Sequence, residues 1–249
     1  MKFSVRILSA LLTLAWTAPA ADLPPGIDPV QAGQDLAREL RSAVPDESAE
    51  FTGTLVIYKG EKSSEVPIRC KIDTNNSGWT VTYDTKGGDS QPPQRLSIKH
   101  APNQTNVYLY AEGKDLNKSR QLKPEELTLP LAGSDFYLMD LGLEFFHWPK
   151  QRLVKQEMRR SRSCRVLEST NTTPTPGAYA RVLSWIDVES DGLLRAEAYD
   201  TKNEPFKIFE VGSFKKLRGK WQLQEIKIRN PKAKTRTELR FNLEPDKPS

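Results

Sequence analysis

The chain has 249 residues, of which 37% are hydrophobic and 28% are charged, and its formal net charge is +5. This length suffices for one large all-β domain. Apart from the first residues, no apolar run approaches the roughly 20 residues that a membrane-spanning helix needs. The mild positive charge is compatible with an anionic partner. Because exported proteins rarely meet nucleic acid, the export signal described next favours an anionic lipid or an acidic protein, and no nucleic acid is expected. The alternative is that the basic residues form a solvated strand face.

The first 21 residues have the three-part pattern of a secretory signal peptide. Lys2 and Arg6 form a short positive start, residues 7–16 are mostly apolar, and small residues follow at the spacing that a signal peptidase accepts. The apolar run is too short to span a membrane. The alternative is a buried N-terminal helix.

The residues after the predicted cleavage site argue against a lipid anchor. A bacterial lipoprotein carries a cysteine directly after the cut, whereas here Ala21 follows and the first cysteine is Cys70. We therefore expect an exported, soluble, periplasmic chain, with one domain over residues 22–249.

An amphipathic helix is predicted after the signal peptide. Asp28 is a suitable cap, Pro29 suits the first helical position, and apolar residues then recur every three or four positions up to Pro45. Such a helix must pack its apolar face against another part of the fold.

Beyond residue 50 the apolar period changes to two, which is typical of β-strands separated by Gly, Asn and Pro turns. The predicted strands cover residues 51–58, 79–83, 96–100, 107–110, 153–159, 164–168, 178–187, 193–199, 206–211, 221–229 and 235–241. About eleven strands do not lie flat easily. We expect a mainly β (α+β) fold, in which a curved antiparallel sheet forms an unclosed barrel covered by helices.

The middle of the chain interrupts the strand pattern. Apolar residues over 138–148 have a spacing closer to that of a helix, with a cap at Ser134 or Asp135 and an end at Pro149. This helix is either a plain core element or a lid over an apolar cavity.

The two cysteines, Cys70 and Cys164, both alternate with polar neighbours and so belong to apolar strand faces. In an oxidising compartment an even count favours a disulfide, worth roughly 2–4 kcal/mol. Two buried thiols are the alternative.

Catalytic and metal-site motifs are not found. The only histidines, His100 and His147, are expected to be structural, and two distant cysteines do not make a zinc site without further ligands. We therefore expect no enzyme activity, no metal and no cofactor, although distant strands can still assemble an active site in space.

Ten apolar residues are candidates for lining a lipid cavity. They are Leu55, Ile57, Trp79, Val81, Phe136, Leu138, Leu141, Phe145, Phe146 and Trp148.

Several motifs together resemble a known group. Gly133-Ser134-Asp135-Phe136 followed by Asp140-Leu141 resembles a G-[ST]-D-F-x-x-x-D-[LM] motif of outer-membrane lipoprotein-sorting proteins, the LolA-like superfamily. Further similar segments, in the same order, are residues 164–168, 182–187, 192–200, 214–216, 219–221 and 227–230.

The resemblance implies an unclosed β-barrel with a helical lid, in a periplasmic protein that shields acyl chains of lipoproteins or lipids on the way to the outer membrane. Its partners would be that cargo and membrane transport proteins, and the chain would be a monomer. Two features depart from the pattern, Leu194 in place of Pro and a strand around Arg69 that is only loosely similar. The alternative is an envelope sensor of the same fold, with a filled barrel and no acyl cargo.

Overall fold

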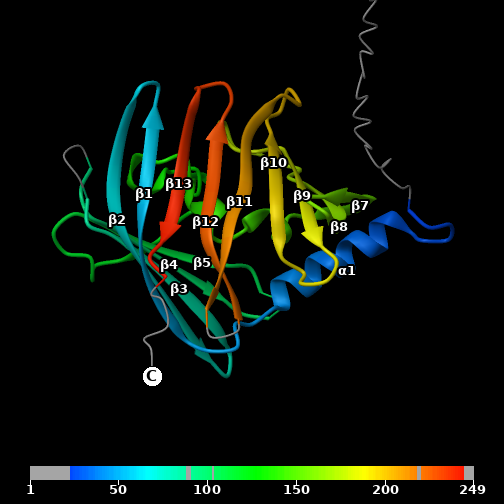
Figure 1. The fold of residues 1–249 in the computed structure, drawn as a ribbon, viewed down its shortest axis with the longest axis horizontal. Helices are drawn as coiled ribbons and strands as arrows, with labels where there is room; N and C mark the ends of the chain where they lie inside the picture. The colour runs from blue at the N-terminus through cyan, green and yellow to red at the C-terminus, as the bar shows by residue number, and fades with distance from the viewer. Residues whose placement is uncertain (1–22, 88–90, 103, 218–219, 244–249) are drawn as a thin grey trace, which may run out of the picture.

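The computed structural model describes residues 23–87, 91–102, 104–217 and 220–243, so the predicted signal peptide lies outside the described residues. Thirteen antiparallel strands form one sheet in the order β6-β5-β4-β3-β2-β1-β13-β12-β11-β10-β9-β8-β7 (Figure 1). The strands are β1 Ala49–Lys59, β2 Lys62–Asn75, β3 Gly78–Thr85, β4 Gln94–His100, β5 Val107–Glu112, β6 Arg120–Gln121, β7 Lys150–Arg159, β8 Arg162–Thr170, β9 Arg181–Asp187, β10 Leu193–Tyr199, β11 Pro205–Leu217, β12 Lys220–Asn230 and β13 Thr235–Phe241.

The expectation of a curved, unclosed antiparallel barrel is confirmed. All eleven predicted strands are present, and the strand face predicted around Cys70 belongs to β2. The short β6 was not predicted. Strand β1 pairs with β13, and from this seam one meander runs outward to the edge strand β6 while the other runs to β7. The chain between the two edges, residues 122–149, crosses the open side of the sheet, and we call it the mid-chain segment.

The mid-chain segment is not the single helix predicted from its spacing. It contains four short helices: η1 Pro124–Glu126, η2 Leu131–Gly133, α2 Leu138–Leu141 and η3 Glu144–His147. Ala132 (φ 50°) and Leu143 (φ 48°) adopt left-handed conformations, which an α-helix cannot continue through. The spacing of apolar residues therefore reflected burial of the segment on nearly all sides, not regular helical periodicity.

The predicted N-terminal helix is confirmed as α1, Pro29–Ser42, which ends three residues before Pro45. The Asp28 carboxylate accepts a hydrogen bond from the Val30 amide at 2.9 Å and so caps the helix. The helix packs on β7 so closely that a Cβ at Gly33 would lie 2.5 Å from the backbone of Arg152. Among the described residues, no helix is long and apolar enough to cross a membrane.

Two large hydrophobic clusters lie between these elements. One joins β1–β5, β12 and β13 to the mid-chain segment, and the other joins α1 to the end of the mid-chain segment and to β7–β10. A small third cluster contains Cys164, Val166 and Trp185.

The predicted disulfide between Cys70 and Cys164 is wrong, because both thiols are free and buried. Cys70 lies on β2, whereas Cys164 lies on β8 near the far end of the sheet order and belongs to the third cluster. Sequence alternation places each cysteine on an apolar face, but it does not bring the two faces together.

Replacing Gly33 by Ala tests the close contact of α1 with β7. The added methyl overlaps the Arg152 backbone, so we expect Gly33→Ala to lower the free energy of unfolding by about 1–3 kcal/mol. Urea unfolding followed by circular dichroism measures this change. Gln31→Ala, at an exposed position of the same helix, is the control; equal midpoints for the two variants would contradict the packing.

Candidate functional site

A cavity of about 560 Å³ lies between the concave face of the sheet and the mid-chain segment, and we call it the sheet cavity. Strands from both meanders contribute to its wall, as do the β9–β10 turn and the residues between α1 and β1. Its lining residues are Pro45, Phe51, Cys70, Ile72, Trp79, Val81, Tyr83, Phe136, Asp140, Leu141, Leu143, Gly192, Leu193, Phe209, Val211, Phe214, Gln222, Leu223, Ile226, Leu239 and Phe241.

The wall of the sheet cavity is mostly apolar. Burial raises the pKa of the Cys70 thiol to about 12 and the pKa of the neighbouring Tyr83 hydroxyl well above its usual value, so both groups are neutral. Asp140 is the one carboxyl group among the described lining residues, and its Oδ2 atom accepts hydrogen bonds from the Tyr137 amide and the Tyr179 hydroxyl. Phe214 is 48% exposed although it lines the cavity, so apolar surface continues from the interior to the solvent.

The ten candidate residues fall into three groups. Trp79, Val81, Phe136 and Leu141 line the sheet cavity. Leu55, Ile57 and Leu138 lie in the adjoining core cluster. Phe145, Phe146 and Trp148 pack beneath α1 in the other cluster.

Sequence reasoning missed the aromatic residues that the later strands contribute to the sheet cavity, namely Phe209, Phe214 and Phe241. All three belong to strands that were predicted, or to their direct continuation. Alternation alone indicates that such residues share a face, but not that this face turns toward the mid-chain segment.

Asp135 attaches the mid-chain segment to β13. Its carboxylate accepts hydrogen bonds from the hydroxyls of Thr235 (2.5 Å) and Thr237 (2.9 Å), and its amide donates to the Thr237 hydroxyl at 2.9 Å. The segment begins and ends on opposite edges of the sheet, so this contact holds its middle against the central strands.

Asp140 and Lys207 make a second attachment, which is fully buried. The Lys207 ammonium donates to the Asp135 carbonyl at 2.5 Å, lies 3.0 Å from the centre of the Tyr137 ring, and is 3.8 Å from an Asp140 carboxylate oxygen. That oxygen also accepts hydrogen bonds from the Tyr137 amide (2.8 Å) and the Tyr179 hydroxyl (3.1 Å). Both aspartates of the G-S-D-F-x-x-x-D sequence therefore hold the segment on the sheet.

Burial works against both charges of this attachment. It lowers the pKa of Lys207 to about 8, with Asp140 and Asp135 opposing the shift. It also raises the pKa of Asp140, and here Lys207 and the two hydrogen-bond donors oppose the shift. Removing either partner would leave the other as an uncompensated buried charge.

The two histidines lie near each other where η3 meets the sheet. The His100 ring stacks on Trp79, with 3.8 Å between ring centres, and so supports one wall of the sheet cavity. Burial lowers the pKa of His100 and of His147 to about 4, and Arg41 lowers the pKa of His147 further. Nearby, the Glu144 carboxylate accepts hydrogen bonds from the Tyr108 hydroxyl and the Asn106 amide.

Comparison with family models shows to which family this chain belongs. A family model described as that of an uncharacterized protein matches residues 82–245. The match covers well over half of the chain, so the chain belongs to this family. No curated protein matches the sequence.

Three solved structures have the same fold. A DUF1329 family protein from Desulfovibrio piger has a TM-score of 0.70 at 17% identity, over 87% of this chain and 92% of that one. A domain described as outer membrane lipoprotein-sorting, from Vibrio parahaemolyticus, has a TM-score of 0.70 at 19% identity, over 86% and 92%. A LolA superfamily protein from Nitrosomonas europaea has a TM-score of 0.59 at 16% identity, over 87% and 93%. The expected resemblance to the LolA-like superfamily is thus confirmed at the level of fold.

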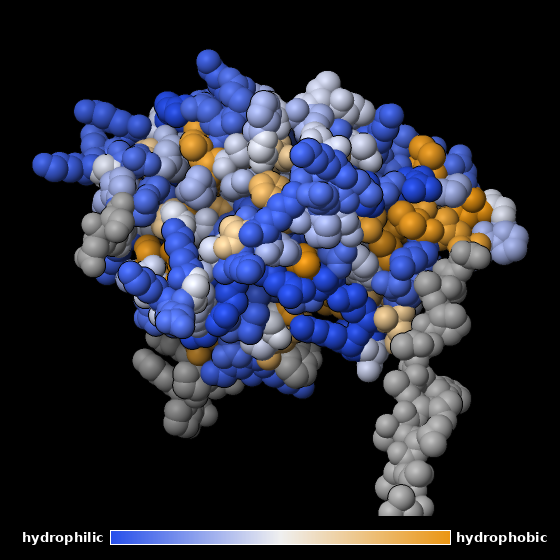
Figure 2. All heavy atoms as spheres, turned by 90° about the horizontal axis from the view of Figure 1, so that it is seen from above, coloured by the Kyte–Doolittle hydropathy of each residue, from blue (hydrophilic) through white to orange (hydrophobic). Residues whose placement is uncertain are grey.

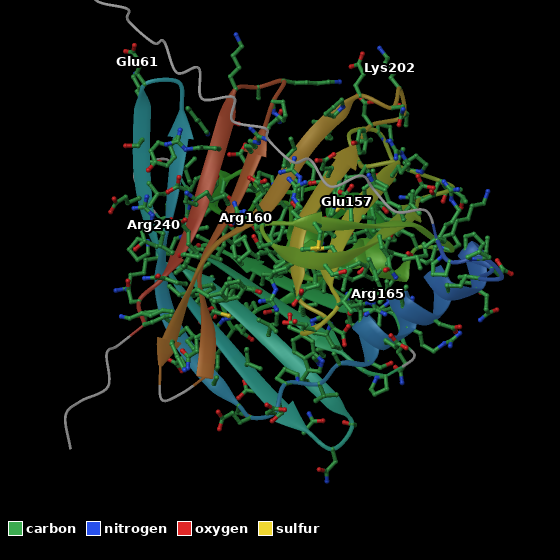
Figure 3. The ribbon with its side chains drawn as sticks, turned by 45° about the vertical axis from the view of Figure 1, so that its right-hand side comes forward. Glu61, Glu157, Arg160, Arg165, Lys202 and Arg240 are labelled. Carbon is green, nitrogen blue, oxygen red and sulfur yellow. The ribbon has the colours of Figure 1, made fainter. Side chains whose placement is uncertain are left out.

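Replacing Lys207 by Met tests the buried attachment. The variant leaves Asp140 without its cation, so we expect a loss of about 3 kcal/mol in the free energy of unfolding. Lys202→Met removes an exposed lysine (Figure 3) and should change this energy by less than about 0.5 kcal/mol. If urea unfolding gave the two variants the same midpoint, Lys207 would not hold the mid-chain segment.

The histidines predict a pH dependence of stability. Their ordinary pKa is about 6.5, so between about pH 6.5 and 4 the unfolded chain binds more protons than the folded chain, and their contribution is lost as the pH falls. Asp140 and Glu144, whose pKa values are raised, act in the opposite direction. The pH dependence of the wild type therefore combines opposing contributions, and the contribution of one histidine is measured by comparing the wild type with a variant that lacks it.

We expect His147→Gln to lose less stability than the wild type between pH 7.5 and 4.5, measured as the shift of the urea midpoint. Asp187 and Asp200, with pKa values of about 2, lose their contributions below this window. Equal losses in variant and wild type would show that His147 does not titrate as a buried neutral group.

Proposed function

We propose that the protein is an exported carrier that holds acyl chains of lipoproteins or lipids in the sheet cavity. The observation that carries this proposal is the apolar cavity of about 560 Å³ between the sheet and the mid-chain segment. Its size is within the range of 300–1,000 Å³ that is typical of ligand sites. The outer membrane lipoprotein-sorting domain of the same fold supports the choice of cargo.

The chemistry of the wall suits the tail of an amphiphile. Each methylene that moves from water into an apolar cavity contributes roughly 0.8 kcal/mol. Asp140 is already held by Lys207, Tyr179 and the backbone, so it offers no free charge to a headgroup. The acyl chain would therefore enter first, and the polar part of the cargo would stay at the opening beside the exposed Phe214.

The alternative, a sensor of the same fold, requires a filled barrel, whereas the sheet cavity favours a carrier. In the proposed role the chain acts in the periplasm as a monomer, with one domain over residues 22–249, and exchanges cargo with membrane transport proteins. The role requires binding and release without catalysis.

A substitution that fills the cavity tests the carrier role. Leu141 lines the cavity, so Leu141→Trp should weaken binding of a fluorescent long-chain fatty acid at least about tenfold, because the added ring occupies the volume that the chain needs. Leu129→Trp places the same side chain at a position that is 40% exposed, away from the sheet cavity, and serves as the control. Binding that is absent in the wild type, or unchanged in Leu141→Trp, would contradict the proposal.

Native mass spectrometry identifies the cargo class. We expect the protein purified from the periplasm of its own cells to carry an acylated species that delipidation removes. Repeated absence of any bound species, from cells in which the protein is expressed at its normal level, would favour the sensor.

A further inference from the structure

Arg229 on β12 has no partner among the residues that the structure describes. It is exposed, and it is the only described arginine for which no hydrogen bond, ion pair or ring contact is found. Other arginines of the sheet have carboxylate partners: Arg240, labelled in Figure 3, contacts Glu225 and Glu238, and Arg95 contacts Asp84. Because Arg229 is exposed and has no protein partner, its guanidinium is available to a ligand from solution.

The position of Arg229 in the sheet makes its lack of a partner costly. Arg229 lies directly opposite Arg236 in the register of β12 and β13. Side chains opposite each other in an antiparallel pair have Cβ atoms about 5 Å apart, and like charges there repel. Arg236 is stacked over the Tyr58 ring at 3.7 Å, and it shares the Glu238 carboxylate with Arg240.

These two arginines face a groove at the β12–β13 turn, and we call it the basic groove. Its volume is about 250 Å³, and it is lined by Tyr58, Gly60, Arg229, Asn230, Pro231, Lys234, Thr235 and Arg236. The lining contains three cations and no carboxylate. Lys234 is exposed and has no ion pair within the described chain.

The basic groove is separate from the sheet cavity. On β12, the lining residue of the cavity nearest to Arg229 is Ile226, which lies three residues, or about 10 Å, away. Side chains three residues apart on a strand point to opposite faces, so the groove and the cavity open on opposite faces of the sheet. The groove lies at the end of the sheet where β12 turns into β13, at the top of Figure 1, and the view onto this end shows mainly hydrophilic side chains (Figure 2).

We propose that the basic groove binds a phosphate-type oxyanion. A guanidinium can donate two parallel hydrogen bonds to such a group, and charge-assisted bonds of this kind are strong. The oxyanion would neutralise the repulsion between Arg229 and Arg236, while the Tyr58 ring holds Arg236 in place. The phosphate can belong to a lipid headgroup or to a small soluble molecule, and the groove recognises the chemistry that both share.

Titration calorimetry with glycerol phosphate, and co-sedimentation with phosphatidylcholine vesicles with and without phosphatidylglycerol, test the proposal on the full mature chain. We expect Arg229→Gln to weaken the binding that the wild type shows by about tenfold or more. Arg38→Gln on α1 removes the same charge from a side chain of similar exposure to that of Arg236, and it should leave binding unchanged.

If the wild type binds both glycerol phosphate and the phosphatidylglycerol vesicles, and Arg229→Gln weakens both, the groove accepts phosphate from a soluble molecule as well as from a lipid headgroup. Binding of the vesicles alone, again weakened in Arg229→Gln, would support a headgroup site. No binding to either probe, or equal weakening by Arg38→Gln, would overturn the proposal. Arg229→Gln should also unfold at the same urea concentration as the wild type or a higher one, because it relieves a repulsion, so lost binding is distinguishable from lost folding.

Discussion

The attachment of the mid-chain segment to the concave face of the sheet is the constraint on which the rest of the structure depends. The edge strands β6 and β7 do not pair with each other, so the barrel stays open between them. The mid-chain segment is the chain that crosses this opening. Asp135 bonds that chain to β13, and Asp140 bonds it to Lys207 and Tyr179. A purely apolar contact would hold the segment as well but would not set its position along the strands, whereas directed hydrogen bonds do.

The same attachment explains why a cavity remains. Lys207 is 3% exposed and sits where the segment touches β11, so the polar contacts hold one part of the segment at a set distance from the sheet. Beside that contact, aromatic and aliphatic side chains from both meanders face each other without filling the space between them. The polar cluster and the apolar cavity are thus adjacent parts of one arrangement: the first positions the segment, and the second is the volume left under it.

The two proposed binding sites lie on opposite faces of the sheet and have opposite chemistry. The sheet cavity is apolar and has no free charge, so its proposed ligand is a hydrocarbon chain. The basic groove is lined by three cations, so its proposed ligand is an oxyanion. Because the two sites open on opposite faces of the sheet, a substitution in one need not alter the other, and in the proposed roles the chain would hold a cargo while it contacts an anionic surface or solute.

Periodicity in the sequence determined the strand positions, the cap and stripe of α1, and the apolar character of the mid-chain segment, because these depend on neighbouring residues only. The motif around Asp135 and Asp140 indicated the superfamily, and the fold agrees. Only the tertiary structure decided that this segment is broken at Leu143, that Cys70 and Cys164 stay apart, and that Lys207 is the buried partner of Asp140. These outcomes depend on which strands the curvature of the sheet brings face to face. Asp140 and Lys207 are 67 positions apart, and no local sequence pattern indicates that they are in contact.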